Sequence, residues 1–113
     1  MPLFQQIAEM IETSIVEDNL KANEKVPSTN ELAKYYQINP ATAAKGINLL
    51  VDQGIIYKRR GVGMFVSNEA KEIILTKKQD NFYDQYVKPM LEEAERINFN
   101  REIIIQWIEE ELR

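Results

Sequence analysis

Two helix-start signals that lie only eleven residues apart constrain the fold of this chain more than any other feature. The first is the capping box Ser28-Thr29-Asn30-Glu31, in which hydroxyl and carboxylate satisfy each other's backbone N–H groups. The second is Asn39-Pro40, which joins a preferred N-cap to proline at the first helical position. Only one short helix and a tight turn fit between them. The spacing therefore predicts a helix-turn-helix whose second helix presents its N-terminal end outward.

Helical periodicity extends this unit on both sides. An apolar stripe predicts a first helix from Leu3 to Asp18, and residues 19–27 are expected to form a connection with at most one short strand. The helix that begins at Asn39 has an inward stripe and is expected to stop at Gly54. The first stripe consists of Phe4, Ile7, Ala8, Ile11 and Ile15, and the second of Ala43, Ile47 and Leu50.

A hairpin is predicted after these helices. Its strands are Ile55–Tyr57 and Met64–Val66, joined by the basic, glycine-containing segment 58–63. Two helices, a tight turn, a third helix and a hairpin form the order of a winged helix-turn-helix. We therefore expect a mainly α fold, an α+β winged helix-turn-helix over residues 1–67, followed by a C-terminal helical dimerisation segment over residues 68–113.

Composition removes most other classes of protein. The 113 residues contain no cysteine and no histidine, which excludes disulfides, thiol nucleophiles, imidazole bases and zinc or haem sites built on them. No apolar run approaches the roughly 20 residues of a spanning helix, and the N-terminus does not resemble a secretory signal. We expect a single-domain, cytoplasmic chain with no membrane association.

The net charge of -4 argues at first against a nucleic-acid partner, because phosphates attract lysine and arginine. Residues 1–66, however, hold seven of the fourteen basic and seven of the eighteen acidic side chains, so that part is neutral. The whole excess of negative charge lies in residues 67–113. The two parts are therefore expected to have different functions.

Charged and polar side chains in the first part suit a DNA duplex. The exposed face of the second helix of the pair begins with Asn39, Ala41, Thr42 and Lys45. Asparagine and threonine can read base edges, alanine can contact a thymine methyl, and lysine can bind guanine or phosphate. Lys58-Arg59-Arg60-Gly61 concentrates positive charge on the wing. Two alternatives remain open: a helical hairpin without a partner, and a winged helix used as a protein-interaction module.

The C-terminal part has aromatic helical stripes that two helices cannot bury against each other alone. We expect a second copy of the chain to cover them, although packing on the N-terminal domain of the same chain is the alternative. The predicted dimer residues are Tyr83, Tyr86, Val87, Met90, Leu91, Ile104, Trp107 and Ile108. Pro89 is expected to kink or break the helix. Acidic pairs such as Asp80 with Asp84 are interpreted as solvated helix faces, so we expect no catalytic site, metal or cofactor.

Five stretches of residues 3–66 resemble the N-terminal domain of GntR-family bacterial transcription regulators. They are Leu3–Ile7, Val26–Ala33, Ile38–Thr42 and Gly54–Ile56 followed by Arg60–Val66. The Asn-Pro-x-Thr form and the short C-terminal tail resemble the small YtrA-like branch. The resemblance implies a homodimeric regulator of a double-stranded DNA operator, commonly a repressor and often of transporter operons.

The resemblance also implies DNA contacts, position by position. Ser28, Thr29 and Asn30 would contact backbone phosphates; Asn39, Pro40, Ala41 and Thr42, with Lys45, would contact bases; and Arg59, Arg60 and Gly61 would form the wing contact. This chain departs from the family where Asn30 and Pro40 replace frequent arginines and where Ala43 and Ala44 replace bulkier or basic residues. No residue pattern specifies an effector ligand.

Overall fold

A computed structural model describes all 113 residues of the chain. Its contacts divide into two compact units, residues 1–77 and 78–113, and each unit is described by itself. None of the helices combines the length and apolar character that crossing a bilayer requires.

Three helices open the first unit: α1 (Leu3–Val16), α2 (Thr29–Tyr36) and α3 (Pro40–Asp52). The capping box is confirmed, since Ser28 Oγ accepts from the N–H of Glu31 at 3.0 Å and the Ser28 N–H donates to the Glu31 carboxylate at 3.1 Å. Gln37, in the left-handed region at φ 54°, ends α2. The N–H of Ile38 then returns to the carbonyl of Ala33 at 3.0 Å. The tight turn of a helix-turn-helix results.

The first helix is shorter than predicted. It ends at Val16, whereas the apolar periodicity suggested an end at Asp18. Asp18 has a φ of 63°, in the left-handed region, so the helix cannot continue through it.

Close packing between α1 and α3 depends on Gly46. A β-carbon placed on this glycine would lie 2.8 Å from the carbonyl oxygen of Phe4 and 3.3 Å from side-chain atoms of Ile7. Glycine is a poor helix former, but here it lets the two helix backbones approach closely. The contact fixes the face that α3 turns toward the core and so the face that it leaves exposed.

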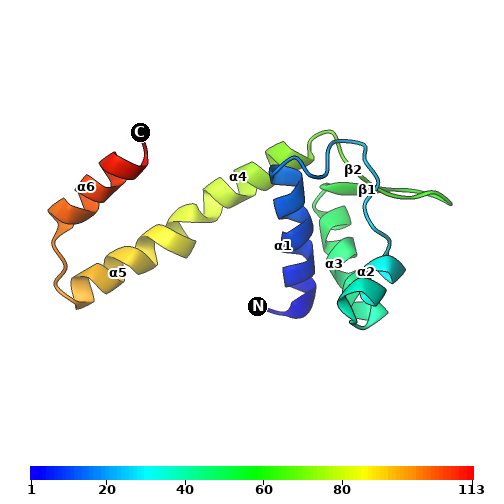
Figure 1. Cartoon of the computed structure of the whole chain (residues 1–113), viewed down its shortest axis with the longest axis horizontal. Coiled ribbons are helices and arrows are strands. Elements are labelled where there is room, and N and C mark those ends of the chain that lie inside the picture. The colour runs from blue at the N-terminus through cyan, green and yellow to red at the C-terminus, as the bar shows by residue number, and fades with distance from the viewer. The chain divides into compact units, whose positions relative to one another are not determined.

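The predicted hairpin is present and extends from the helices in Figure 1. Strands β1 (Ile56–Arg59) and β2 (Gly63–Val66) pair antiparallel, with Ile56 opposite Val66 and Arg59 opposite Gly63. Both strands reach further toward the tip than predicted. Only residues 60–62 remain as the turn, which the N–H of Val62 closes by donating to the carbonyl of Arg59 at 2.9 Å.

The connection between α1 and α2 adds a third segment to the sheet. Lys25 forms an isolated bridge with Phe65. The flanking N–H groups of Val26 and Val66 donate to the carbonyls of Met64 and Glu24 at 2.8 Å and 3.0 Å. The short strand allowed for in residues 19–27 is thus a single bridged position.

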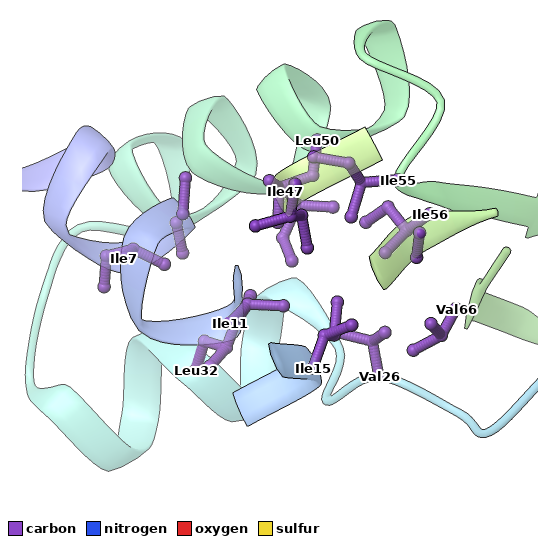
Figure 2. Packing of buried hydrophobic residues seen from close by; sticks show 14 of the residues in the cluster. Ile7, Ile11, Ile15, Val26, Leu32, Ile47, Leu50, Ile55, Ile56 and Val66 are labelled. Carbon is purple, nitrogen blue, oxygen red and sulfur yellow. The ribbon is translucent and has the colours of Figure 1, made fainter. Parts of the chain in front are cut away.

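One apolar core lies between the helices and the sheet of the first unit. Figure 2 shows that its side chains come from α1, α2, α3, the hairpin and the connection at Val26, and point toward one another. The predicted inward stripe of α3 is confirmed, because Ala43, Ile47 and Leu50 are all buried. The labelled core residues are Ile7, Ile11, Ile15, Val26, Leu32, Ile47, Leu50, Ile55, Ile56 and Val66.

Helix α4 (Ala70–Phe82) contributes its first turns to the same unit. Ala70 and Ile74 are buried in the core, although the sequence placed residues 68–77 with the C-terminal region. Lys77 continues the attachment: its Nζ lies 2.6 Å from Oε2 of Glu12 and donates to Oε1 of Gln53 at 3.1 Å. Glu12 is only 4% exposed and its Oε2 accepts no hydrogen bond of ordinary geometry, so the nearby ammonium is its charge compensation.

The second unit is helical. After α4 comes one π-helical stretch, η1 (Tyr83–Val87), then α5 (Lys88–Arg96) and α6 (Arg101–Glu111). Pro89 sits in the first turn of α5, directly after the π-helical stretch. Proline has no N–H to donate and crowds the carbonyl four residues before it, which explains why regular α-helix is interrupted here as predicted. Asn100 caps α6 by accepting from the N–H of Glu102 at 2.8 Å.

Candidate nucleic-acid interface

The N-terminal end of α3 is exposed, as the helix-turn-helix prediction requires. Asn39, Pro40 and Ala41 are exposed and Thr42 is half-buried. Asn39 Oδ1 accepts from the N–H of Ala41 at 2.8 Å, which caps the helix. The two amide N–H donors of Asn39 take no part in this cap, and they complement a base-edge acceptor such as a purine N7.

Beyond the tip, the exposed face of α3 borders the start of α1. The predicted outward group Ala41, Ala44, Lys45 and Asn48 lines one shallow groove together with Phe4. Lys45 Nζ lies 4.1 Å from the centroid of the Phe4 ring, a cation–π contact that holds the ammonium beside the helix. Phe4 was not predicted as a site residue, because its apolar spacing assigned it to the core stripe.

The substitutions at Ala43 and Ala44 have different consequences. Ala43 is 0% exposed, so its small side chain serves packing and cannot contact a duplex. Ala44 is half-buried on the groove face of α3. Of these two alanines, therefore, only Ala44 changes the surface that a duplex could meet.

At the start of α2, Ser28 and Thr29 are half-buried and Asn30 is exposed. The N–H of Ser28 donates to the Glu31 carboxylate, and the Ser28 hydroxyl oxygen accepts from the N–H of Glu31. The pKa of Glu31 is lowered by the hydrogen bond from the Ser28 backbone, then by that from its side chain, and further by the charge of Lys25. An ionised carboxylate therefore lies beside Ser28, Thr29 and Asn30. Because this carboxylate repels a phosphate, a phosphate that binds here needs positive charge nearby.

The wing provides such charge. Lys58, Arg59, Arg60 and Gly61 are all exposed. Arg59 belongs to β1 rather than to the loop, and its guanidinium carbon lies 5.3 Å from the centroid of the Phe65 ring. Gly61, with a φ of 76° and no atom within 4 Å of a β-carbon placed there, forms the open tip of the turn.

Lys25 is a further wing cation that the sequence did not reveal. Its bridge to Phe65 brings it to the sheet from a position forty residues away in the chain. Within residues 19–27 no periodicity marked this lysine, because a single bridged residue leaves no alternating pattern. Only the long-range pairing places it beside the hairpin.

The predicted dimer residues form an apolar surface in the second unit. Ile104 is the only one that is buried, while Tyr86 is 63% and Trp107 51% exposed. Met90, Ile104 and Trp107 line one apolar groove of this unit together with Phe99. Tyr83, Leu91 and Ile108 are exposed, and Val87 is half-buried.

No group of three or more acidic side chains lies together in a way that could hold a metal ion. The acidic residues of α5 are exposed. The polar and charged groups that the structure exposes for a partner are therefore hydrogen-bond donors and cations rather than a metal-binding cluster.

Comparisons with known proteins agree with this arrangement. HTH-type transcriptional repressor YtrA of Bacillus subtilis is 29% identical over 96% of this chain and 83% of its own length. A solved GntR family transcriptional regulator from Listeria monocytogenes superposes with a TM-score of 0.76 at 29% identity, covering 97% of this chain and 95% of that one. AraR(DBD), solved in complex with operator ORX1, gives a TM-score of 0.57 at 33% identity, over 59% of this chain and 81% of that chain.

These likenesses confirm the mainly α, winged-helix fold with a helical C-terminal part. The family described as "Bacterial regulatory proteins, gntR family" matches residues 3–66, more than half of the chain. Its members are regulatory proteins rather than enzymes, as the sequence led us to expect. The chain belongs to the GntR family of bacterial regulatory proteins.

Proposed function

We propose that the protein is a homodimeric transcriptional repressor that binds a double-stranded DNA operator through its winged helix-turn-helix. The observation that carries this proposal is the exposed N-terminal end of α3, in a unit that also presents a wing with three consecutive basic residues. A helix of this kind enters the major groove with its first residues toward the base edges, while a basic wing meets phosphates or the minor groove. The operator complex of AraR(DBD) supports the assignment by likeness.

The proposed contacts divide by chemistry. Ser28, Thr29 and Asn30 would donate to phosphates, and Asn39 and Thr42 would read bases, with Pro40, Ala41 and Lys45 beside them. Arg59, Arg60 and Gly61 would bind at the wing. A protein of this type represses by occupying the promoter, and the name of YtrA, which is described as a repressor, supports that sign of regulation. Such a role places the protein with bacterial DNA in the cytoplasm, and a transporter operon remains the proposed target.

Selection of duplexes from a random pool tests the central claim. The wild-type protein should enrich one site with two-fold symmetry. Asn39→Ala or Thr42→Ala should change the preferred bases, since each wrong contact costs about 1–3 kcal/mol. An unchanged preferred site would remove these residues from base recognition.

A salt titration tests the wing. Replacement of Arg59 and Arg60 by alanine should weaken binding and flatten the dependence of the logarithm of the binding constant on salt, by about 0.9 per lost phosphate contact. Lys88→Ala, on exposed α5, is the control for loss of charge alone. An unaltered slope would count against the wing assignment.

The proposed dimer rests on the exposed apolar side chains of the second unit. With Ile104 as its only buried large apolar residue, this unit lacks a core sufficient for independent stability. A second copy would cover the surface, and a two-fold protein would double the contacts made on a symmetric operator. Trp107→Asp should give monomers in sedimentation, whereas Gln106→Asp, at an exposed polar position of α6, should not. An unaltered mass for Trp107→Asp would overturn the interface.

A further inference from the structure

The side chain of Lys25 lies across the backbone of Gly63. Lys25 bridges Phe65, and directly opposed residues of an antiparallel pair project from the same face of the sheet. A β-carbon placed on Gly63 would lie 2.8 Å from Cε of Lys25 and 3.6 Å from its Nζ. Gly63 is two residues closer to the hairpin tip than Phe65, so the lysine side chain runs along β2 toward the tip.

Arg59 approaches the same glycine from the other side. It is the residue paired with Gly63 in the register of β1 and β2. Its guanidinium carbon lies 5.3 Å from the centroid of the Phe65 ring, which places it on the face that also carries Lys25. Two cations, one from β1 and one from the connection between α1 and α2, thus lie on the face of the sheet where Gly63 has no side chain.

Neither Lys25 nor Arg59 forms an ion pair at contact distance. The ion pairs of the chain use other basic residues: Lys71, Lys77, Arg96 and Arg101. Two like charges on one face repel each other, and an anion between them would remove that repulsion. The bare backbone of Gly63 leaves room for the Lys25 side chain to cross β2, which brings its ammonium toward the strand that carries Arg59.

The position of Lys25 also connects the two parts of the proposed interface. Its charge acts on Glu31, in the capping box at the start of α2. The positive charge of Lys25 thus contributes to the electrostatics at the start of α2, beside Ser28, Thr29 and Asn30. Positive charge extends in this way from the wing toward the start of α2.

We propose that Lys25 and Arg59 together bind one backbone phosphate of DNA across the backbone of Gly63. This inference rests on the proposed function, and it adds a phosphate site to which a residue outside the hairpin contributes. Arginine would supply paired N–H donors, and lysine a point charge at the opposite side of the phosphate.

The test uses the full-length protein and a fluorescent random-sequence duplex, since a phosphate contact is independent of base sequence. Lys25→Met keeps the aliphatic stem that lies on Gly63 and removes the charge. Lys21→Met is the matched control: Lys21 is exposed in the same connection, but lines a groove with Val66 and Ser67, at the end of β2 away from the tip. Arg59→Met and the double variant Lys25→Met/Arg59→Met complete the set, and circular dichroism checks that each folds.

Lys25→Met should flatten the salt dependence by about one phosphate contact, equivalent to a roughly 3-fold smaller change in affinity between about 50 and 200 mM salt. Lys21→Met should bind like the wild type, and Lys25→Arg should restore the wild-type slope. Because one phosphate is shared, the double variant should lose less affinity than the product of the two single losses.

Two results would overturn the proposal while leaving the proposed function intact: a Lys25→Met slope equal to that of Lys21→Met, or losses in the double variant that multiply fully. Failure of the wild-type protein to bind any duplex at low salt would instead remove the proposed function, and this inference with it.

Discussion

Gly46→Ala is expected to destabilise the protein, although alanine is the better helix former. In an exposed helix interior, replacing glycine by alanine adds about 1 kcal/mol of stability. Position 46 differs because the new β-carbon would lie 2.8 Å from the carbonyl oxygen of Phe4 and 3.3 Å from Cβ and Cγ2 of Ile7. The first of these atoms belongs to the backbone of α1 and cannot rotate away, so the whole helix has to shift.

Overpacking of this kind costs about 1–3 kcal/mol, and the displaced α1 also carries Ile7 and Ile11 in the core. After subtraction of the helix-propensity gain, we expect a net loss of about 1 kcal/mol and a fall in melting temperature of about 4 °C. The same shift moves Phe4 away from Lys45, so the position of the ammonium on the exposed face of α3 should change as well.

Urea denaturation followed by circular dichroism measures this effect, at fixed protein concentration because the proposed dimer couples stability to concentration. Asn48→Gly and Asn48→Ala, at an exposed position of the same helix, form the control pair and give the propensity difference directly. A Gly46→Ala protein stabilised by the full difference between those two variants would refute the argument that close approach of α1 and α3 requires glycine.

Two further substitutions probe charged groups outside the proposed DNA contacts. Lys77→Met should destabilise the protein by about 2 kcal/mol, which is less than for a fully buried ion pair because the lysine is partly exposed. Adding Glu12→Leu should recover most of this loss of stability. Equal denaturation midpoints for Lys77→Met and wild type would show that the charge of Glu12 needs no compensation. Glu31→Gln should be less stable than wild type at neutral pH, and this difference should vanish in acid. The reason is that the pKa of Glu31 is lowered in the folded protein. The stabilising effect of the Glu31 carboxylate is therefore present above the unfolded-state pKa and is lost as pH falls through the folded-state pKa. A stability difference between Glu31→Gln and wild type that persists unchanged at low pH would contradict this role of the capping box.

Local rules sufficed for the helix-turn-helix and the proline-interrupted C-terminal helix. Caps at Ser28, Asn39 and Asn100 depend on side chains that bond to backbone groups within three residues, so they can be identified from the sequence itself. Pro89 acts through its own ring and missing donor in the same way. The expectation that these elements form a winged helix followed from their order alone.

The features that depend on contacts between distant residues could not be predicted. By helix propensity, Gly46 is expected only to destabilise its helix. The close approach of Phe4 and Ile7, which requires glycine at this position, is visible only in the tertiary structure. The inclusion of Ala70 and Ile74 in the first core, and the pairing of Lys77 with Glu12, likewise required the tertiary structure.

Lys25 is the clearest case. The sequence by itself determined where helices start, which faces are apolar and where the wing is basic, because these properties arise from neighbours along the chain. Only the tertiary structure decided that Lys25 crosses Gly63 opposite Arg59, because strand pairing joins residues forty positions apart and no local pattern encodes such a contact.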